Sequence, residues 1–133
     1  FIVSAMRDSA PDSTPLQKIQ IIKGWVDEQG NMQQRVFDVA GNSEPLASVN
    51  PATCEQSGEG FSNLCAVWRD AEFDPSVSAV YYSRVIENPS CRWSRYDCNA
   101  IAPEVRPEQC TDGSMEDVIQ ERAWTSPIWY SAR

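Results

Sequence analysis

The chain has 133 residues, with 19 acidic and 11 basic side chains, a net charge of −8 and no histidine. This length fits one domain with a core of its own. The acidic surface would repel phosphate backbones, so we expect no nucleic-acid partner. No apolar run is long enough to span a bilayer, so we expect no membrane insertion. The lack of histidine removes the commonest general base and transition-metal ligand.

The first third of the chain predicts three strands. Phe1–Met6, Lys18–Val26 and Gln33–Ala40 are rich in β-branched and aromatic residues. The segment between the second and third strands contains Gly30 in a polar setting, which is typical of a hairpin turn. The sequence has the composition of a strand from its first residue, Phe1, through Met6. We therefore expect residues 1–133 to be one β domain from the C-terminal part of a longer protein.

Two long polar excursions interrupt the strands that follow. Gly41–Gly60 is poor in apolar residues, and Asn88–Gly113 contains three cysteines and three prolines. Between these excursions, Phe61–Trp68 and Ser78–Ile86 are predicted strands. Ser78–Ile86 has large apolar side chains on both faces, so we expect it near the centre of a sheet. Loops of this length need a staple to be stable in a compact domain.

The segment from Glu121 to Tyr130 predicts a closing strand, since it is dense in aromatic and β-branched residues. Pro127 lies inside it and cannot donate a ladder hydrogen bond. This places the strand at a sheet edge or at a bend between two sheets. The chain as a whole predicts an all-β, antiparallel, two-sheet β-sandwich of about six to seven strands with two long disulfide-stapled loops.

Five cysteines are many for a cytosolic domain of this size, and we expect disulfides in an oxidising compartment, periplasmic or secreted. The cysteines are Cys54, Cys65, Cys91, Cys98 and Cys110. The spacing favours a Cys54–Cys65 bridge together with either Cys91–Cys98 or Cys98–Cys110. One cysteine remains free in either case. No pair has the close spacing of zinc ligands, so we expect no metal or other cofactor there.

Asp70, Glu72 and Asp74 alternate as in the first part of a calcium-binding loop. The pattern then fails, because Tyr81 stands where such a loop has its bidentate glutamate. A solvated turn before the next strand is the better interpretation, and we expect no metal site.

Two groups of residues are candidates for binding rather than catalysis. Arg92, Trp93, Arg95 and Tyr96 could form a stacked cationic surface for sugars, carboxylates or a partner protein. The alternative is that the two aromatic rings plug this loop onto the sandwich while the arginines bind nearby carbonyls. Arg122 and Trp124 are better suited to packing or domain docking than to catalysis. No residue set forms an active site, so we expect the chain alone not to be an enzyme.

Four segments carry a family resemblance: Lys18–Trp25, Val67–Pro75, Tyr81–Ser94 and Gln120–Tyr130. Together they resemble the C-terminal part of a large bacterial family of unknown function, the domain-of-unknown-function family 3604. Its full-length members resemble metal-dependent hydrolases of the polymerase-and-histidinol-phosphatase type, and many carry export signals. Their expected metal ligands are histidines and acids in upstream segments, none of which this chain matches.

The resemblance implies an accessory β domain that packs against an upstream hydrolase-like domain of the same polypeptide. The alternative is an autonomous secreted module that binds carbohydrate or protein through Arg92–Tyr96. The oligomeric state stays open.

Overall fold

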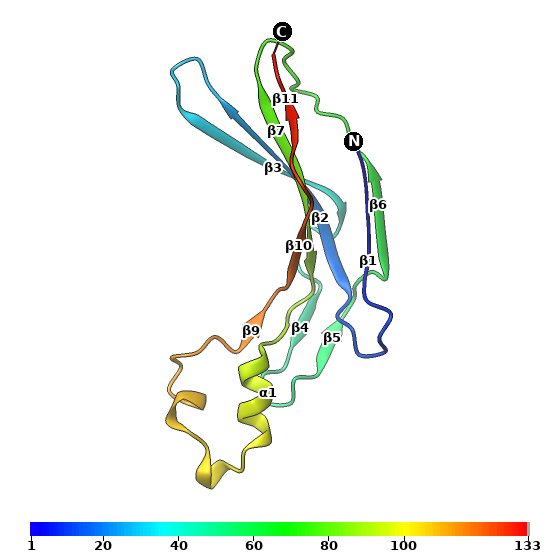
Figure 1. The fold of residues 1–133 in the computed structure, drawn as a ribbon. Coiled ribbons are helices and arrows are strands. Elements are labelled where there is room, and N and C mark those ends of the chain that lie inside the picture. The colour runs from blue at the N-terminus through cyan, green and yellow to red at the C-terminus, as the bar shows by residue number, and fades with distance from the viewer. Residues whose placement is uncertain (133) are drawn as a thin grey trace.

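The computed structural model describes residues 1–132, which form an elongated molecule with a β-sandwich at one end and a disulfide-linked lobe at the other (Figure 1). The longer strands are β1 (Ile2–Met6), β2 (Leu16–Val26), β3 (Met32–Gly41), β6 (Asn63–Val67) and β7 (Ala79–Glu87). The shorter strands are β4 (Ala47–Val49), β5 (Gln56–Gly58), β8 (Ser90–Cys91), β9 (Val118–Ile119), β10 (Arg122–Trp124) and β11 (Ile128–Tyr130). The helix α1 is Trp93–Ala100, and 3-10 turns span Pro103–Val105 and Glu108–Cys110.

The large sheet is antiparallel, with the strand order β10-β7-β2-β3 and with β11 also paired to β7. The predicted hairpin of β2 and β3 is confirmed, and Gly30 in its turn has φ of 83°. The predicted central position of β7 is also confirmed, because β7 pairs with β2 on one side and with β10 and β11 on the other.

A small sheet of β1 and β6 covers one face of the large sheet, which confirms a two-layer antiparallel β architecture. The core lies between the layers, where Leu16, Ile19 and Leu64 are at most 8% exposed and pack with Val3 and partly buried neighbours. Burying such side chains fully stabilises the fold by roughly 1.5–3 kcal/mol each. The second layer has only two strands, so it covers part of the larger sheet.

The closing segment forms two short strands, β10 and β11, rather than one. Pro127 lies between them, and Thr125 bridges the gap: its N–H donates to the Ser83 carbonyl, and its hydroxyl accepts from the Ser83 N–H, both at 3.0 Å. Both strands stay on β7 at the border of the large sheet. The edge interpretation of Pro127 is therefore correct, and the bend between two sheets is wrong.

The two long excursions meet in the lobe at the far end of the molecule (Figure 1). The first contains the β4–β5 hairpin, and the second contains α1, both 3-10 turns and the β8 strand that pairs with β9. The disulfides of the two long loops are present as expected, and the loops also contain short regular elements that the sequence did not indicate. The helix has only eight residues and one buried side chain, Cys98, so its sequence has little amphipathic periodicity to reveal it.

Candidate functional site

Two disulfides fix the lobe, and one prediction of their pairing is wrong. Cys54 pairs with Cys91 instead of Cys65. Cys98 pairs with Cys110, which confirms one of the two alternatives for the second bridge and rules out Cys91–Cys98. Cys65 is an exposed free thiol, because it alternates with the core residue Leu64 on β6 and so faces outward.

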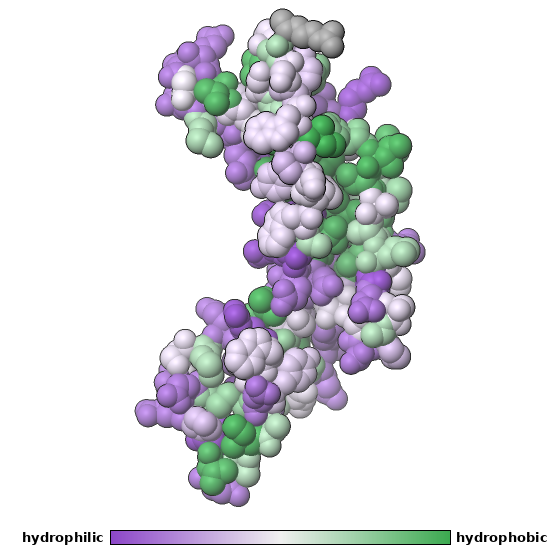
Figure 2. Space-filling view, in the orientation of Figure 1, coloured by the Kyte–Doolittle hydropathy of each residue, from purple (hydrophilic) through white to green (hydrophobic). Residues whose placement is uncertain are grey.

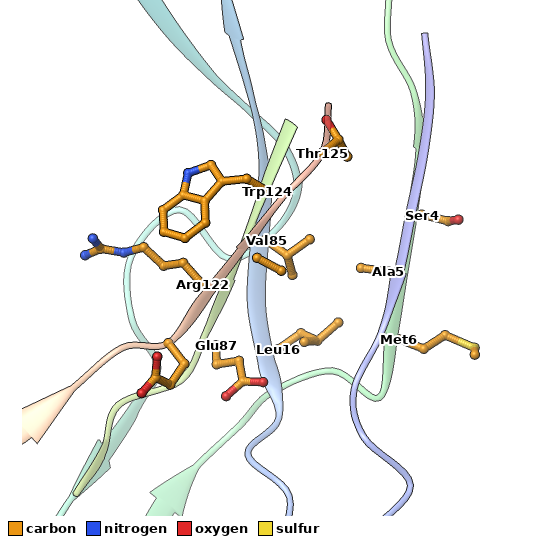
Figure 3. Close-up of a pocket in the computed structure, with 11 residues that line it drawn as sticks. Ser4, Ala5, Met6, Leu16, Val85, Glu87, Arg122, Trp124 and Thr125 are labelled. Atoms are coloured by element: carbon orange, nitrogen blue, oxygen red, sulfur yellow. The ribbon is translucent and has the colours of Figure 1, made fainter. Parts of the chain in front are cut away.

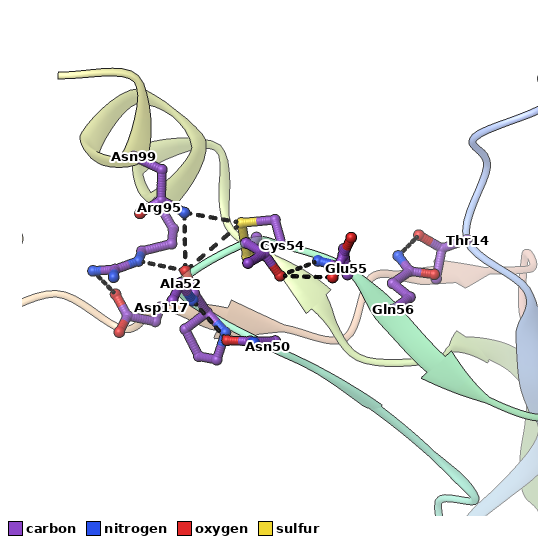
Figure 4. Close-up of a disulfide and its surroundings, with 12 residues drawn as sticks. Thr14, Asn50, Ala52, Cys54, Glu55, Gln56, Arg95, Asn99 and Asp117 are labelled. Carbon is purple, nitrogen blue, oxygen red and sulfur yellow. Dashed lines mark hydrogen bonds and ion pairs between the residues drawn. A yellow bond between two sulfur atoms is a disulfide. The ribbon is translucent and has the colours of Figure 1, made fainter. Parts of the chain in front are cut away.

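Arg95 on α1 is a structural residue of the lobe rather than a free binding group. Its guanidinium donates to the Pro51 carbonyl oxygen at 2.8 Å and lies 3.4 Å from Oδ1 of Asp117 (Figure 4). It also donates to the Cys110 carbonyl oxygen at 3.1 Å. Asn99, one turn further along α1, donates to the same Pro51 oxygen at 2.9 Å. These contacts join the first excursion, α1 and the segment before β9 around the Cys54–Cys91 bridge.

Trp93 and Tyr96 do not plug the lobe onto the sandwich, because their exposed fractions are 73% and 51%. Residues three apart lie on the same side of a helix, so the two rings form one exposed surface of α1. Tyr96 also borders a hollow of about 550 Å³ beside the Pro11–Ser13 loop. Arg92 is half-buried at the start of α1, and its N–H donates to the Asp117 carbonyl at 2.9 Å.

The second candidate pair, Arg122 and Trp124, lies on β10. Both side chains project to the side of the large sheet that faces away from β1 (Figure 3), and Trp124 is 60% exposed. This is the face that the small sheet does not cover. In register, Trp124 stands opposite Arg84 of β7, which donates to Gln20 at 2.6 Å.

We call this uncovered side of the large sheet the open sheet face. It is defined by Ile22, Gly24, Val26, Met32, Gln34, Val36, Val80, Tyr82, Trp124 and Trp129. A column of pale aromatic side chains follows β10 and β11 in Figure 2. Met32 is 91% exposed and Trp129 is 74% exposed. Large apolar side chains on a strand are usually more buried than this.

A groove of about 590 Å³ lies in the open sheet face between the tip of the β2–β3 hairpin and β11. Gly24 lies on its floor, where a Cβ would come within 3.1 Å of the Val80 side chain. Trp129 stands beside Val80 in register and walls the groove. The sequence signal for this groove is the presence of apolar residues on both faces of β7, which also predicts the central position of that strand.

A buried charged cluster lies at the other face of the large sheet. Nζ of Lys23 is 2.6 Å from Oδ2 of Asp70 and 3.0 Å from the Glu72 carbonyl oxygen. The Tyr81 hydroxyl donates to the same Asp70 oxygen at 2.7 Å. The Lys23 ammonium also lies 5.3 Å from the ring centre of Trp25. The cluster ties the loop after β6 to the two central strands.

The cluster keeps its charges in fixed states. Burial raises the pKa of the Asp70 carboxyl, but hydrogen bonds from Lys23, Tyr81 and the Glu72 N–H outweigh it and leave this pKa below its ordinary 3.8. Burial raises the pKa of the Tyr81 hydroxyl, and its bond to Asp70 raises it further. The hydroxyl is thus a persistent donor and not a base, and the arrangement serves packing rather than proton transfer.

The same contacts explain why the Asp70–Asp74 segment is not a calcium loop. Asp70 holds Lys23, Glu72 pairs with Arg35 at the surface, and Asp74 accepts from Ser76 at 2.6 Å. The three carboxylates therefore point to separate partners. The signal that sequence reasoning overlooked was Lys23, a charged residue that directly follows the apolar pair Ile21 and Ile22 in the middle of a strand.

A family model described as "Protein of unknown function (DUF3604)" matches residues 1–132. The chain belongs to this family. The match confirms the family resemblance carried by the four sequence segments. Neither a curated protein nor a solved structure gives a significant match.

The described part of this DUF3604 chain holds no cluster of three or more histidine, cysteine, aspartate or glutamate side chains that could bind a metal ion. Within residues 1–132, no helix combines the length and hydropathy that crossing a membrane requires. The two disulfides indicate an oxidising environment, extracellular or periplasmic.

Proposed function

We propose that this chain is a non-catalytic β domain that docks on another folded domain through the open sheet face. The supporting observation is the row of exposed apolar and aromatic side chains there, including Met32, Val26 and Trp129. Soluble monomers seldom expose a contiguous apolar surface of this kind unless a partner covers it. The opposite face of the same sheet is already covered in part by β1 and β6.

The residue types favour a protein partner over a small ligand. Tryptophan, tyrosine, methionine and arginine are enriched at the centres of protein interfaces. The open sheet face offers Trp124, Trp129, Tyr82 and Met32, and Arg122 stands at its border. The groove beside Trp129 gives a partner side chain a place to insert.

We further propose that the partner is the metal-dependent hydrolase domain that the family resemblance implies, upstream in the same polypeptide. In this proposal the histidine and acidic metal ligands belong to that domain, and the present chain contributes none. The full-length protein would be a bacterial protein, exported to the periplasm or secreted. The two disulfides support that location.

The first test is the coding sequence upstream of Phe1. A histidine- and aspartate-rich metal motif in the same reading frame is expected. An upstream region without any such motif would remove the proposed partner.

The second test measures docking by titrating the separately produced upstream region with the chain. Trp129→Glu and Met32→Glu should each weaken binding by about tenfold or more, as for interface residues that lose their apolar contacts. Val67→Glu is the matched control, since Val67 is 82% exposed but lies on β6, away from the open sheet face. Equal binding by all three variants would contradict the proposal.

A second candidate function rests on the exposed rings of Trp93 and Tyr96 on α1. They support an autonomous module that binds carbohydrate or protein. Screening the chain against glycans and proteins should then find a ligand whose binding falls on Trp93→Ala, with the thermal unfolding midpoint unchanged. A screen without hits, or hits insensitive to Trp93→Ala, would count against this candidate and leave docking through the open sheet face unaffected.

A further inference from the structure

The small sheet leaves part of the inner face of the large sheet without a covering strand. β6 lies over β3 and β2, and β1 lies over β2. The side chains of Val3, Ala5 and Leu64 fill the space beneath these two strands. β1 also reaches part of β7, because Val3 packs against the cluster of Ile21, Ala79 and Tyr81. No strand of residues 1–132 pairs with the other edge of β1, on the side of β10 and β11. The second layer therefore ends before it reaches β10 and β11, the border strands of the first.

Two adjoining hollows occupy this uncovered strip along β1. One, of about 350 Å³, lies between Ser4–Met6 and the side chains of Val85 and Ala123. The other, of about 140 Å³, lies between Phe1–Val3 and Ile128. Figure 3 shows Ala5 and Val85 pointing toward each other across the first hollow, while Ser4 and Met6 point away from it. Val85 and Ala123 thus give the floor of the first hollow apolar side chains, and its wall is the edge of β1.

The backbone of β1 faces the strip with unpaired groups. Phe1 and Trp68 exchange two backbone bonds, at 2.7 and 2.8 Å, and the Arg7 N–H donates to Ser62 at 3.0 Å. In an antiparallel ladder the residues between such pairs direct their N–H and C=O groups to the opposite edge. In β1 these residues are Ile2, Ser4 and Met6, and β6 is the only strand of the described chain that pairs with β1.

One end of the strip is acidic. Glu87 and Glu121 both line the hollow near Met6. Burial raises the pKa of the Glu87 carboxyl, and the negative charges of Glu121 and Asp8 raise it further. Within residues 1–132, neither Glu87 nor Glu121 is in an ion pair. Arg122 does not neutralise them, because its side chain extends to the opposite side of the sheet (Figure 3).

We propose that the free edge of β1 accepts one extended strand from a partner protein, antiparallel to β1, with apolar side chains on the floor and a lysine or arginine beside Glu87 and Glu121. Backbone bonds to Ile2, Ser4 and Met6 supply affinity, as in other cases where a peptide extends a sheet. Because the floor is apolar, every second side chain of the bound strand should be apolar. The two carboxylates set the direction of the bound strand, since its basic end should lie beside them. This site is separate from the open sheet face and does not depend on docking there.

The probe is the synthetic peptide Lys-Thr-Val-Thr-Val-Thr-Val, with blocked ends, titrated into the full chain. Amide hydrogen exchange read by nuclear magnetic resonance should slow at Ile2, Ser4 and Met6. The amides of Val3 and Ala5, which already donate to β6, are the internal control. Exchange that slows elsewhere but not at these three amides would overturn the proposal, as would the absence of any binding.

Two N-methylated peptides test the backbone bonds without altering the protein. One is methylated on its valines and the other on its threonines, so only one of them loses the N–H groups that face β1. That peptide should bind at least about tenfold more weakly, since several hydrogen bonds are lost together. The other should bind like the parent. Equal affinity of the two methylated peptides would contradict strand pairing.

Charge is tested by replacing the lysine of the peptide with glutamate. The glutamate peptide should bind about tenfold more weakly to the wild-type chain, because like charges would meet at the acidic end. In the double variant Glu87→Gln/Glu121→Gln this difference should disappear. A difference that persists would refute the assigned direction. Protection of Ile2, Ser4 and Met6 without peptide, together with dimerisation, would show a second copy at the edge and overturn the proposal.

Discussion

Nζ of Lys23 lies 2.6 Å from Oδ2 of Asp70, and this ion pair joins the middle of the central strand β2 to the loop that follows β6. Both side chains are at least nine-tenths buried. Protein atoms therefore take the place of water around the pair. If one partner is removed, the charge of the other remains buried and unpaired.

Asp70→Ala should lower the free energy of unfolding by about 3 kcal/mol, because it leaves the Lys23 ammonium without its carboxylate. Glu72→Ala is the matched control on the same loop. Its ion pair with Arg35 is exposed to solvent, so its loss should cost less than about 1 kcal/mol. Urea unfolding followed by tryptophan fluorescence measures both. Equal losses in the two variants would show that the buried pair has no special role.

Tyr81 should make the fold sensitive to alkali. Burial and the bond to Asp70 raise the pKa of its hydroxyl in the folded chain, whereas in the unfolded chain this pKa is about 10. The folded state holds the proton more tightly, so the stabilisation is complete below about pH 10 and is lost as the pH rises further. Stability measured against pH should fall less steeply in Tyr81→Phe than in the wild type. Tyr96→Phe, on the exposed surface of α1, should follow the wild-type curve.

Alanine substitutions at two glycines should distinguish the stability lost to a positive φ from the stability lost to a steric clash. Gly30 and Gly41 have φ of 83° and 86°, but a Cβ meets nothing within 4 Å at Gly30 and lies 2.2 Å from the Gln17 carbonyl oxygen at Gly41. Gly30→Ala should cost about 1 kcal/mol of stability, and Gly41→Ala about 3 kcal/mol. Denaturant midpoints give the comparison. Similar values for both would mean that the β3 terminus relaxes freely.

The Cys54–Cys91 bridge should stabilise the lobe and not the sandwich. Its 37-residue separation corresponds to about 4 kcal/mol of loop-closure stabilisation. In the double variant Cys54→Ser/Cys91→Ser, amide exchange should accelerate in α1, while the amides of β2 and β7 keep their protection. Cys65→Ser is the control, since its thiol is free and exposed. Loss of protection in β2 would show that lobe and sandwich unfold together.

Much of the sandwich could be predicted from local patterns. The β-branched and aromatic content of β2 and β3, the turn at Gly30 and the doubly apolar faces of β7 depend on neighbours in sequence, so the central strands follow from the chain alone. The resemblance also led to the correct family. The edge position of the closing strand followed from the missing N–H of Pro127.

The disulfide partner of Cys54 could not be predicted in this way. Nearness in sequence favoured Cys65, but the outward alternation of β6 removes that thiol from reach, and Cys91 approaches from a segment 37 residues distant. The Lys23–Asp70 pair depends on a contact between residues 47 positions apart. Neither contact leaves a local periodicity. The exposure of Trp124 and Trp129 was missed for a related reason, since an apolar strand face gives no sign of whether a second layer lies over it.

The break at Pro127 has a consequence for the solution behaviour of the chain. β10 and β11 lie at the border of the large sheet, where a continuous row of free N–H and C=O groups would invite the same border of another molecule. Thr125 to Pro127 divide that row into two pieces of three residues each, and proline offers no N–H between them. Neither piece is long enough to template a stable new strand. The chain should therefore resist fibre growth from this border even though tryptophans are exposed along it.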